Sequence, residues 1–444
     1  MKTGASGTSE QLVHDVIDDG QVSGQQLLVI ALCFILNLLD GFDITAMAVV
    51  AGAVAQDLSL APDRLGWIFS FALAGMMVGA MLLAPVADII GRRILIVSAV
   101  LIVGISVLLT ASASTLFEFV VLRFVAGVGA GAMLACQATL AAEYSPNKYK
   151  ALSVAIVTSG YPAGAMLTSV AAGHIMPDYG WTGMFWFGGG VTLVMGFIAW
   201  LLIPESLKYL FERRPTNALE RINRILKKLG KDVLDGMPTV TTGDARRSAG
   251  LVATMLKLVS RQHRAVTLQL WSAFFLAFAA LYFLMSWIPR LMEDAGFTVA
   301  DGRRAFFLFN LGAVAGIYLL GLLSTRWKLS NIITLFMAAS AVGMVVFALS
   351  PRNLDLLLVI IFLVGLLQQG GFTGMYSAAA KAYSTEVRST GIGWAIGFGR
   401  TGAVVGPALA GYLIAGGLDM SDNFIVFAVP MALSALFAYR LHIR

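Results

Sequence analysis

Long runs of apolar residues, rather than the short alternating stretches of a soluble protein, dominate this chain. Each run holds about twenty residues or more, which lets an α-helix cross a hydrocarbon core of ~30 Å. The pattern predicts an all-α membrane protein with twelve transmembrane helices. The runs lie near 27–52, 65–87, 94–112, 117–142, 151–175, 181–203, 265–289, 302–324, 329–350, 353–380, 390–416 and 421–440.

A polar stretch in the middle of the chain divides the twelve runs into two groups of six. The residues before the first run are polar, which argues against a cleaved signal peptide. We expect a cytoplasmic N-terminal tail over 1–26, a six-helix bundle over 27–203, a cytoplasmic linker over 204–264, a second six-helix bundle over 265–440 and a cytoplasmic tail over 441–444.

The two halves also resemble each other in sequence. A shift of 239 residues aligns Tyr144 with Tyr383 and brings Tyr161 opposite Arg400. A parallel repeat of six helices is the organisation of a large class of transporters, in which the solute binds between the halves near the membrane midplane. The repeat therefore predicts two parallel six-helix halves with a central binding site between them.

Apolar residues recur at helical spacing within the linker, between Thr216 and Leu229. This spacing predicts a short amphipathic helix on the cytoplasmic membrane surface, near anionic lipid. A charged linker that only joins the two bundles is the alternative.

Composition and charge agree with a membrane protein. The chain of 444 residues is 58% hydrophobic and 13% charged, with a mean hydropathy of +0.82, whereas a soluble domain carries about 25% charged residues. Of its 31 Lys and Arg, 24 fall on the side of both termini, five on the other side and two inside spans. This bias predicts cytoplasmic termini in a bacterial-type inner membrane and explains the net charge of +6 without a nucleic acid partner.

Polar and charged residues form a stripe on the first predicted helix. Asn37, Asp40 and Asp43 are three residues apart, so they share one face. Charge inside a span costs a few kcal/mol and marks a functional site by default. We expect the stripe to carry a coupled proton or to contact the substrate; a structural ion pair is the alternative.

Two arginines lie inside spans. Arg123, on the fourth helix, is at the depth of Asp43, and the two predict an ion pair that either breaks on protonation or is static. Arg400, on the eleventh helix, lies near the midplane, where a guanidinium can bind a carboxylate through two hydrogen bonds. It predicts an anionic solute, although an internal counter-charge is the alternative.

Several further side chains are candidates for the wall of a central cavity. Each is polar or aromatic and falls inside a predicted span, although such residues more often serve packing. The candidates for substrate binding, besides Arg400 and Asn37, are Tyr161, Gln368, Gln369, Tyr282 and Trp394.

Nothing in the sequence favours an enzyme. There is no glycine-rich phosphate loop with Lys and Ser or Thr. The four histidines are scattered, and the two cysteines, Cys33 and Cys136, lie in apolar runs. We therefore expect no catalytic residues, no metal site, no disulfide framework and no cofactor other than the coupled proton.

Three motifs resemble those of the major facilitator superfamily. Residues 84–93 read APVADIIGRR, similar to the loop signature G-x-x-x-D-R-x-G-R-R; residues 123–129 read RFVAGVG, similar to R-x-x-x-G-x-G; and residues 204–210 read PESLKYL. Residues 40–43, DGFD, and residues 399–403, GRTGA, resemble elements of its aromatic acid:proton symporters.

This resemblance implies import of a benzoate-like or hydroxybenzoate-like carboxylate together with protons, by alternating access and by a monomer. It implies a cytoplasmic gate formed by Asp88, Gly91, Arg92 and Arg93. Glu143 is expected beside this gate and, with Asp40, Asp43 and Arg123, in proton coupling.

The sequence also departs from the family pattern. Ala84 and Ile89 replace the Gly and Arg of the loop signature, and the second-half copy at 321–326, GLLSTR, lacks its Asp. The antiporter run of the fifth helix is poorly matched at 159–164. The alternatives are a porter for another organic anion, a drug antiporter, or a transporter-like sensor of aromatic acids.

Overall fold

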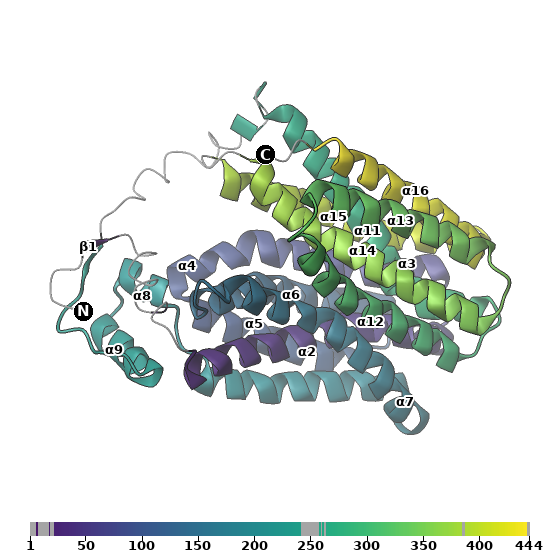
Figure 1. Cartoon of the computed structure of the whole chain (residues 1–444). Helices are drawn as coiled ribbons and strands as arrows, with labels where there is room; N and C mark the ends of the chain where they lie inside the picture. Colours follow the sequence, from purple (N-terminus) through teal and green to yellow (C-terminus); the bar gives the residue numbers. More distant parts are fainter. Residues whose placement is uncertain are drawn as a thin grey trace.

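The computed structural model describes residues 6–7, 17, 22–240, 257–258, 260–261, 263–383 and 387–441. The described chain is almost entirely helical, with two parallel strands of two residues each, β1 (Ser6–Gly7) and β2 (Thr239–Val240). Figure 1 shows the long helices side by side in two groups, with short helices at one end.

The first group of helices accounts for six passes. Its members are α2 (Gly24–Asp57), α3 (Pro62–Val78), α4 (Ala87–Ile90), α5 (Arg92–Thr110), α6 (Leu116–Glu143) and α7 (Lys150–Leu202). The π-helical turn η1 (Gly79–Leu83) and the 3-10 turn η2 (Ala84–Val86) extend α3 to α4. Helix α7 is two passes, because Gly180 (φ 62°, ψ −166°) interrupts it.

The second group supplies six more passes. They are α11 (Arg264–Asp294), α12 (Val299–Leu323), α13 (Leu329–Leu349), α14 (Leu354–Ala382), α15 (Arg388–Ala415) and α16 (Met420–Tyr439). In the described residues, ten helices are long and apolar enough to cross a membrane; α7 is one of them and makes two passes. Helix α15 falls outside the ten because it carries Arg400 and several glycines. The predicted twelve-helix, all-α fold is confirmed.

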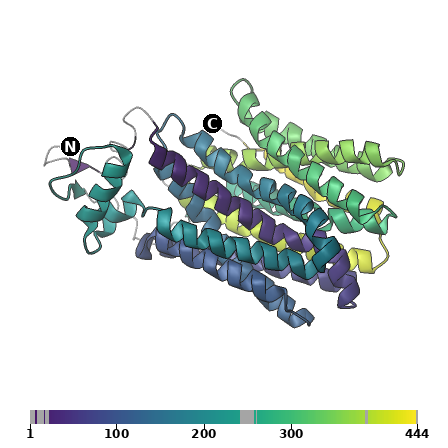
Figure 2. The ribbon, with the colours of Figure 1, turned by 90° about the horizontal axis from the view of Figure 1, so that it is seen from below.

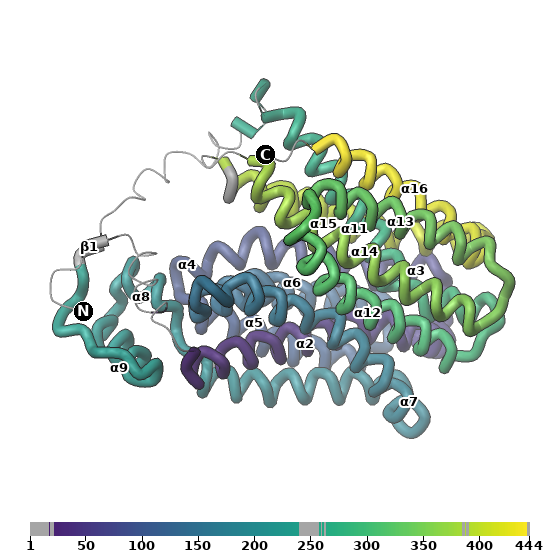
Figure 3. Tube along the Cα trace, viewed as in Figure 1, coloured from purple at the N-terminus to yellow at the C-terminus, as the bar shows by residue number. Residues whose placement is uncertain are grey.

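Between the groups lie α8 (Leu207–Arg213) and α9 (Ala218–Leu229). They sit at the end of the bundle where α2 begins and α16 ends, which we call the linker end (Figures 1 and 3). The opposite end, near Asp57 and Asp294, is the far end.

The apolar side of α9 packs on protein. Ile222, Leu226 and Leu229 are buried in a cluster with the linker-end residues of α2, α5 and α6. This face is therefore covered by protein, with α8 and α2 packed against α9, and its placement on the membrane surface stays a prediction. The charged side, including Arg224, remains exposed.

Glycines allow the closest helix pairs to form. A Cβ on Gly127 of α6 would collide with the main-chain carbonyl of Ala72 in α3, and one on Gly402 of α15 would collide with that of Phe275 in α11. Small residues let membrane helices approach to backbone contact. Figure 2 shows the same close alignment for α2, in purple, which lies along α7.

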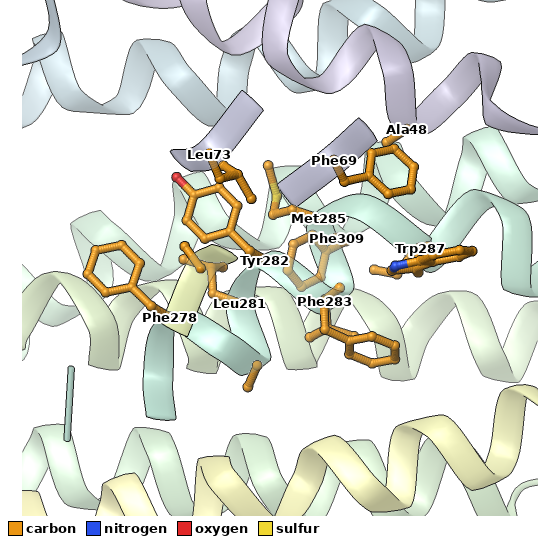
Figure 4. Close-up of a cluster of buried hydrophobic side chains, with 14 of the residues drawn as sticks. Ala48, Phe69, Leu73, Phe278, Leu281, Tyr282, Phe283, Met285, Trp287 and Phe309 are labelled. Carbon is orange, nitrogen blue, oxygen red and sulfur yellow. The ribbon is translucent and has the colours of Figure 1, made fainter. Parts of the chain in front are cut away.

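The two groups join at the far end. Ser70 of α3 donates to the carbonyl of Val404 in α15 at 2.6 Å, and Trp67 donates to the hydroxyl of Tyr412 at 3.1 Å. Figure 4 shows Phe69 and Leu73 facing the Tyr282–Trp287 stretch of α11. The rings of Phe69 and Trp287 meet edge to face with centroids 5.4 Å apart.

Candidate functional site

A cavity of about 1990 Å³ lies between the two groups of helices. We call it the central cavity. It reaches from Tyr161 and Arg400 inside the bundle to Asp88, Lys150 and Lys328 at the linker end. Because the far end is closed by the α3–α15 contacts, the cavity opens only toward the linker end in the described part of the chain. A solute could enter the bundle from that side and go no further.

Arg400 is the charged residue of the inner part of the cavity. Its side chain is only 8% exposed, and its guanidinium lies over the ring of Phe278 at 6.0 Å. Its Nε has no hydrogen-bond partner among the described residues, nor does an acidic side chain there lie within 4.0 Å of it. The donors of Arg400 are therefore available to a ligand carboxylate.

Aromatic side chains from α11 and α14 form an apolar wall beside Arg400. The ring of Phe278 stacks on Tyr282 at 6.0 Å and meets Phe372 edge to face at 4.7 Å. Tyr376 continues the wall, 5.5 Å from Phe372. Offset and edge-to-face contacts are the geometries that aromatic rings prefer, so the wall suits a flat aromatic ligand.

Four of the five predicted wall residues line the cavity: Tyr161, Tyr282, Gln369 and Trp394. Gln368 does not line it. Neighbouring residues of a helix point about 100° apart, so Gln368 points away from the cavity and is buried among the packed helices. Neither of its amide atoms has a partner among the described residues.

The stripe on α2 is buried and does not line the cavity. Asn37, Asp40 and Asp43 are 1–2% exposed. Asn37 donates to Gln137 of α6 at 3.2 Å, so its amide is committed to packing between helices in this conformation. Neither carboxylate oxygen of Asp40 has a hydrogen-bond partner in the described residues, and its charge interacts with those of Asp43 and Arg400.

The expected contact between the Asp43 carboxylate and Arg123 is not formed. Arg123 donates instead to the main-chain carbonyl of Asp43 at 3.0 Å, and its guanidinium lies over Phe185 at 5.0 Å. The carboxylate accepts from Thr192 at 2.9 Å. The two charges still interact, but no direct ion pair joins them, and Oδ1 of Asp43 and Nε of Arg123 have no hydrogen-bond partner among the described residues.

Two polar residues of this region had no part in the sequence prediction. Thr192 lies 149 residues from Asp43, and no local pattern links them. Asn310 lies in the cavity wall and is 0% exposed, with Oδ1 unpartnered in the described residues. A polar residue in the middle of an apolar run was the signal that could have identified Asn310.

The predicted gate residues form a network at the linker end. Arg92 is ion-paired with Glu143 and lies 3.7 Å from Asp88, and Glu143 accepts from Ser206 at 2.6 Å. Arg92, Asp88 and Glu143 belong to the first half, and Ser206 belongs to the linker. In this conformation the network forms no hydrogen bond or ion pair with the second half within the described chain.

Glu205 ties the other gate residues to the same network. It accepts from the main-chain N–H of Arg93 at 3.0 Å and lies 3.8 Å from Arg221. Gly91 has a φ of 101°, and a Cβ there would lie 2.5 Å from Glu205 Oε2. Only glycine fits this turn without strain.

Glu143 is distant from the other residues expected in proton coupling. It follows Arg123 by 20 positions on the same helix, which is ~30 Å at 1.5 Å per residue. Its partners are Arg92 and Ser206, so it belongs with the gate residues.

Comparison with known proteins gives the family. The model of the Major Facilitator Superfamily matches residues 33–351 and 270–443. The chain belongs to the Major Facilitator Superfamily. The twelve passes of this superfamily member are membrane spans, and the cavity lies between its two halves.

Relatives in the superfamily match nearly the whole chain. A gallate transporter of Pseudomonas putida is 30% identical over 96% of this chain and 93% of its own length. The 4-hydroxybenzoate transporter PcaK of Acinetobacter baylyi is 29% identical over 95% and 92%, and a benzoate transport protein of that organism is 27% identical over 97% and 93%.

Solved structures of the superfamily share the fold. A bacterial homolog of the human lysosomal transporter Spinster, inward-facing and occupied, aligns with a TM-score of 0.71 and 17% identity over 95% of this chain and 97% of that one. The inward open xylose transporter XylE from E. coli aligns with a TM-score of 0.71 and 14% identity over 94% and 96%.

Proposed function

We propose that the chain is a proton-coupled symporter that imports an aromatic carboxylate by alternating access. The observation that carries this proposal is a guanidinium with free donors beside a wall of aromatic rings in the cavity between the halves. Full-length similarity to transporters named for gallate, 4-hydroxybenzoate and benzoate supports the same substrate class.

Arg400 binds the carboxylate of the substrate in this proposal. Its fork of donors matches a carboxylate through two parallel hydrogen bonds. The ring lies along Phe278, Phe372 and Tyr376, which exclude water from one of its faces. Tyr161, Tyr282, Gln369 and Trp394 complete the pocket.

Asp40 couples the proton to the substrate. When Asp40 is ionised, its charge interacts with Arg400 and repels a second carboxylate nearby. Protonation removes that charge and leaves Arg400 to the substrate. Since the proton and the substrate then favour each other's binding, they move together. Asp43, held by Thr192 beside Arg123, is the second candidate for the proton.

The energetics favour cotransport. An anion that enters against a negative interior loses about 2.3 kcal/mol per charge per 100 mV. One accompanying proton cancels this term, so the pH gradient drives uptake. A second proton would add the membrane potential to the driving force.

The linker end is the cytoplasmic end in this proposal. The excess of Lys and Arg on that side follows the positive-inside rule, and it makes the structure inward-open in a bacterial inner membrane. The network of Asp88, Arg92 and Glu143 is then a cytoplasmic gate. The protein works as a monomer, without a metal or cofactor, and catalyses no reaction.

Uptake into proteoliposomes tests this function. When the outside is made more acidic, radiolabelled benzoate and 4-hydroxybenzoate should accumulate to a higher level than in protein-free vesicles. A protonophore should abolish this excess accumulation. Binding without accumulation would favour an aromatic-acid sensor. No binding of either acid would favour a porter of another organic anion or a drug antiporter.

A further inference from the structure

Two buried polar atoms in the wall of the central cavity have no hydrogen-bond partner in the described chain: Arg400 Nε and Asn310 Oδ1. The first can only donate, and the second can only accept. The carboxylate of a substrate satisfies donors. It cannot satisfy Asn310, because an ionised carboxylate has no hydrogen to donate.

The orientation of the Asn310 amide is determined by its own helix. Its Nδ2 donates to the carbonyl of Phe306, one turn earlier, at 2.9 Å. Turning the amide over would bring two acceptors together, so Oδ1 must point away from that carbonyl. The side chain is 0% exposed, so water in the cavity does not reach this oxygen in the present conformation, and a ligand reaches it only when closure of the halves rearranges the wall. A buried acceptor without a donor is unfavourable, and a ligand that supplies the donor gains affinity.

The surroundings of Asn310 suit the ring end of an aromatic acid. It lies on α12 and shares the cavity wall with Phe278 and Tyr282 of α11 and with Arg400 of α15. A ligand whose carboxylate is at Arg400 places its ring along Phe278. The substituents of that ring then point to other parts of the wall, and closure of the halves brings the wall against them.

We propose that Asn310 selects aromatic acids that carry a hydrogen-bond donor on the ring, such as a phenolic hydroxyl, over acids without one. This inference rests on the proposed function, since it assumes an aromatic carboxylate at Arg400. The ring hydroxyl donates to Oδ1 of Asn310. Family membership leaves the point open, because the relatives are named for benzoate as well as for hydroxylated acids.

Binding to the wild-type protein provides the first test. Dissociation constants are measured by calorimetry for benzoates with a hydroxyl, an amino group or a fluorine at the 3 or 4 position. Hydroxyl and amino groups donate; fluorine is of similar size and does not. At one of the two ring positions, we expect the hydroxyl- and amino-substituted benzoates to bind at least about tenfold more tightly than the fluorobenzoate. If the dissociation constants of the donor-substituted benzoates and the fluorobenzoates agree within twofold at both positions, the inference is overturned and the proposed function stands. If no aromatic acid binds, the proposed function fails instead.

A substitution assigns the effect to the residue. Asn310→Leu keeps the approximate shape and removes the acceptor, so the advantage of the donors should fall below about threefold while the fluorobenzoate affinity stays within twofold. Ser340→Ala removes another buried oxygen that has no partner among the described residues, on α13 and away from the cavity, and should retain the full advantage. Unchanged selectivity in Asn310→Leu would contradict the inference. The wild-type series stands even if this variant fails to fold.

Discussion

At the scale of single residues, the site is defined by side chains that are buried and charged yet not directly paired. Asp40 and Arg400 come from different halves, and each is at most 8% exposed. Their charges interact, although no direct ion pair joins them. Burying charge is costly unless a partner compensates it. Protonation of Asp40 removes one buried charge but leaves Arg400 without a compensating charge, and a substrate carboxylate bound at Arg400 supplies it. Each event therefore lowers the free-energy cost of the other.

Replacing Arg400 by lysine tests how the carboxylate is held. Arg400→Lys keeps the charge but loses the planar fork, so we expect the affinity for 4-hydroxybenzoate to fall about tenfold or more. Calorimetry on the purified variant measures it. Arg304→Lys is the matched control, because Arg304 is exposed and pairs only with Asp301 on its own helix among the described residues. Equal affinity in Arg400→Lys and wild type would argue against two-point binding.

Replacing Asp40 by asparagine separates binding from coupling. Asp40→Asn mimics the protonated side chain, so the substrate should bind about as well as in wild type. Exchange of labelled for unlabelled substrate should continue, while accumulation driven by a pH gradient should be lost. Both are measured in the same proteoliposomes. Normal driven accumulation would remove Asp40 from proton coupling and leave Asp43 as the candidate.

Single residues also show where prediction from sequence ends. Asp40, Asp43, Arg123 and Arg400 could be singled out because charge inside an apolar run is rare and costly. Their partners could not, because Thr192 reaches Asp43 across 149 residues of chain. In the present conformation Thr192 donates to Oδ2 of Asp43 and Arg123 donates to its main-chain carbonyl, so the expected ion pair is not formed there.

At the scale of helices, apolar runs predicted each pass within a few residues, and the break at Gly180 falls between the runs 151–175 and 181–203. The helical spacing of 216–229 indicated an amphipathic segment, but not what covers its apolar side. That depends on α8 and α2, which pack against it. The sequence also could not predict which side of α14 faces the cavity.

Close packing of α3 on α6 gives a prediction at this scale. Gly127→Ala adds a Cβ that collides with the carbonyl of Ala72, and overpacking of this kind costs about 1–3 kcal/mol. We expect a lower melting temperature in detergent. At Gly173 of α7 no atom of the described residues lies within 4 Å of an added Cβ, so Gly173→Ala should leave the melting temperature unchanged or raise it. Equal behaviour of the two variants would contradict the packing.

At the scale of the whole molecule, transport requires the far-end contacts to separate as the linker end closes. Ser70 and Val404 touch across the halves in the present conformation. The cavity is lined by both halves, so a rocking motion can expose it to either side in turn. The linker-end network joins residues of the first half and the linker in the described chain, which leaves it free to contact the second half after closure.

A disulfide at the far end tests this motion. In the double variant Ser70→Cys, Val404→Cys, oxidation should hold the halves together and stop substrate exchange, and reduction should restore it. Each single variant serves as a control for oxidation, since the native Cys33 and Cys136 are buried. Exchange that continues at the wild-type rate in the fully cross-linked protein would rule out the proposed separation of the halves.

The most direct test of the whole account is proton movement caused by the substrate. Proteoliposomes with a pH-sensitive dye inside are mixed with 4-hydroxybenzoate without any imposed gradient, and acidification is compared with that of protein-free vesicles to subtract passive entry of the neutral acid. The account predicts faster acidification with the wild-type protein and no excess with Asp40→Asn. Substrate uptake without excess acidification in the wild type would contradict proton symport.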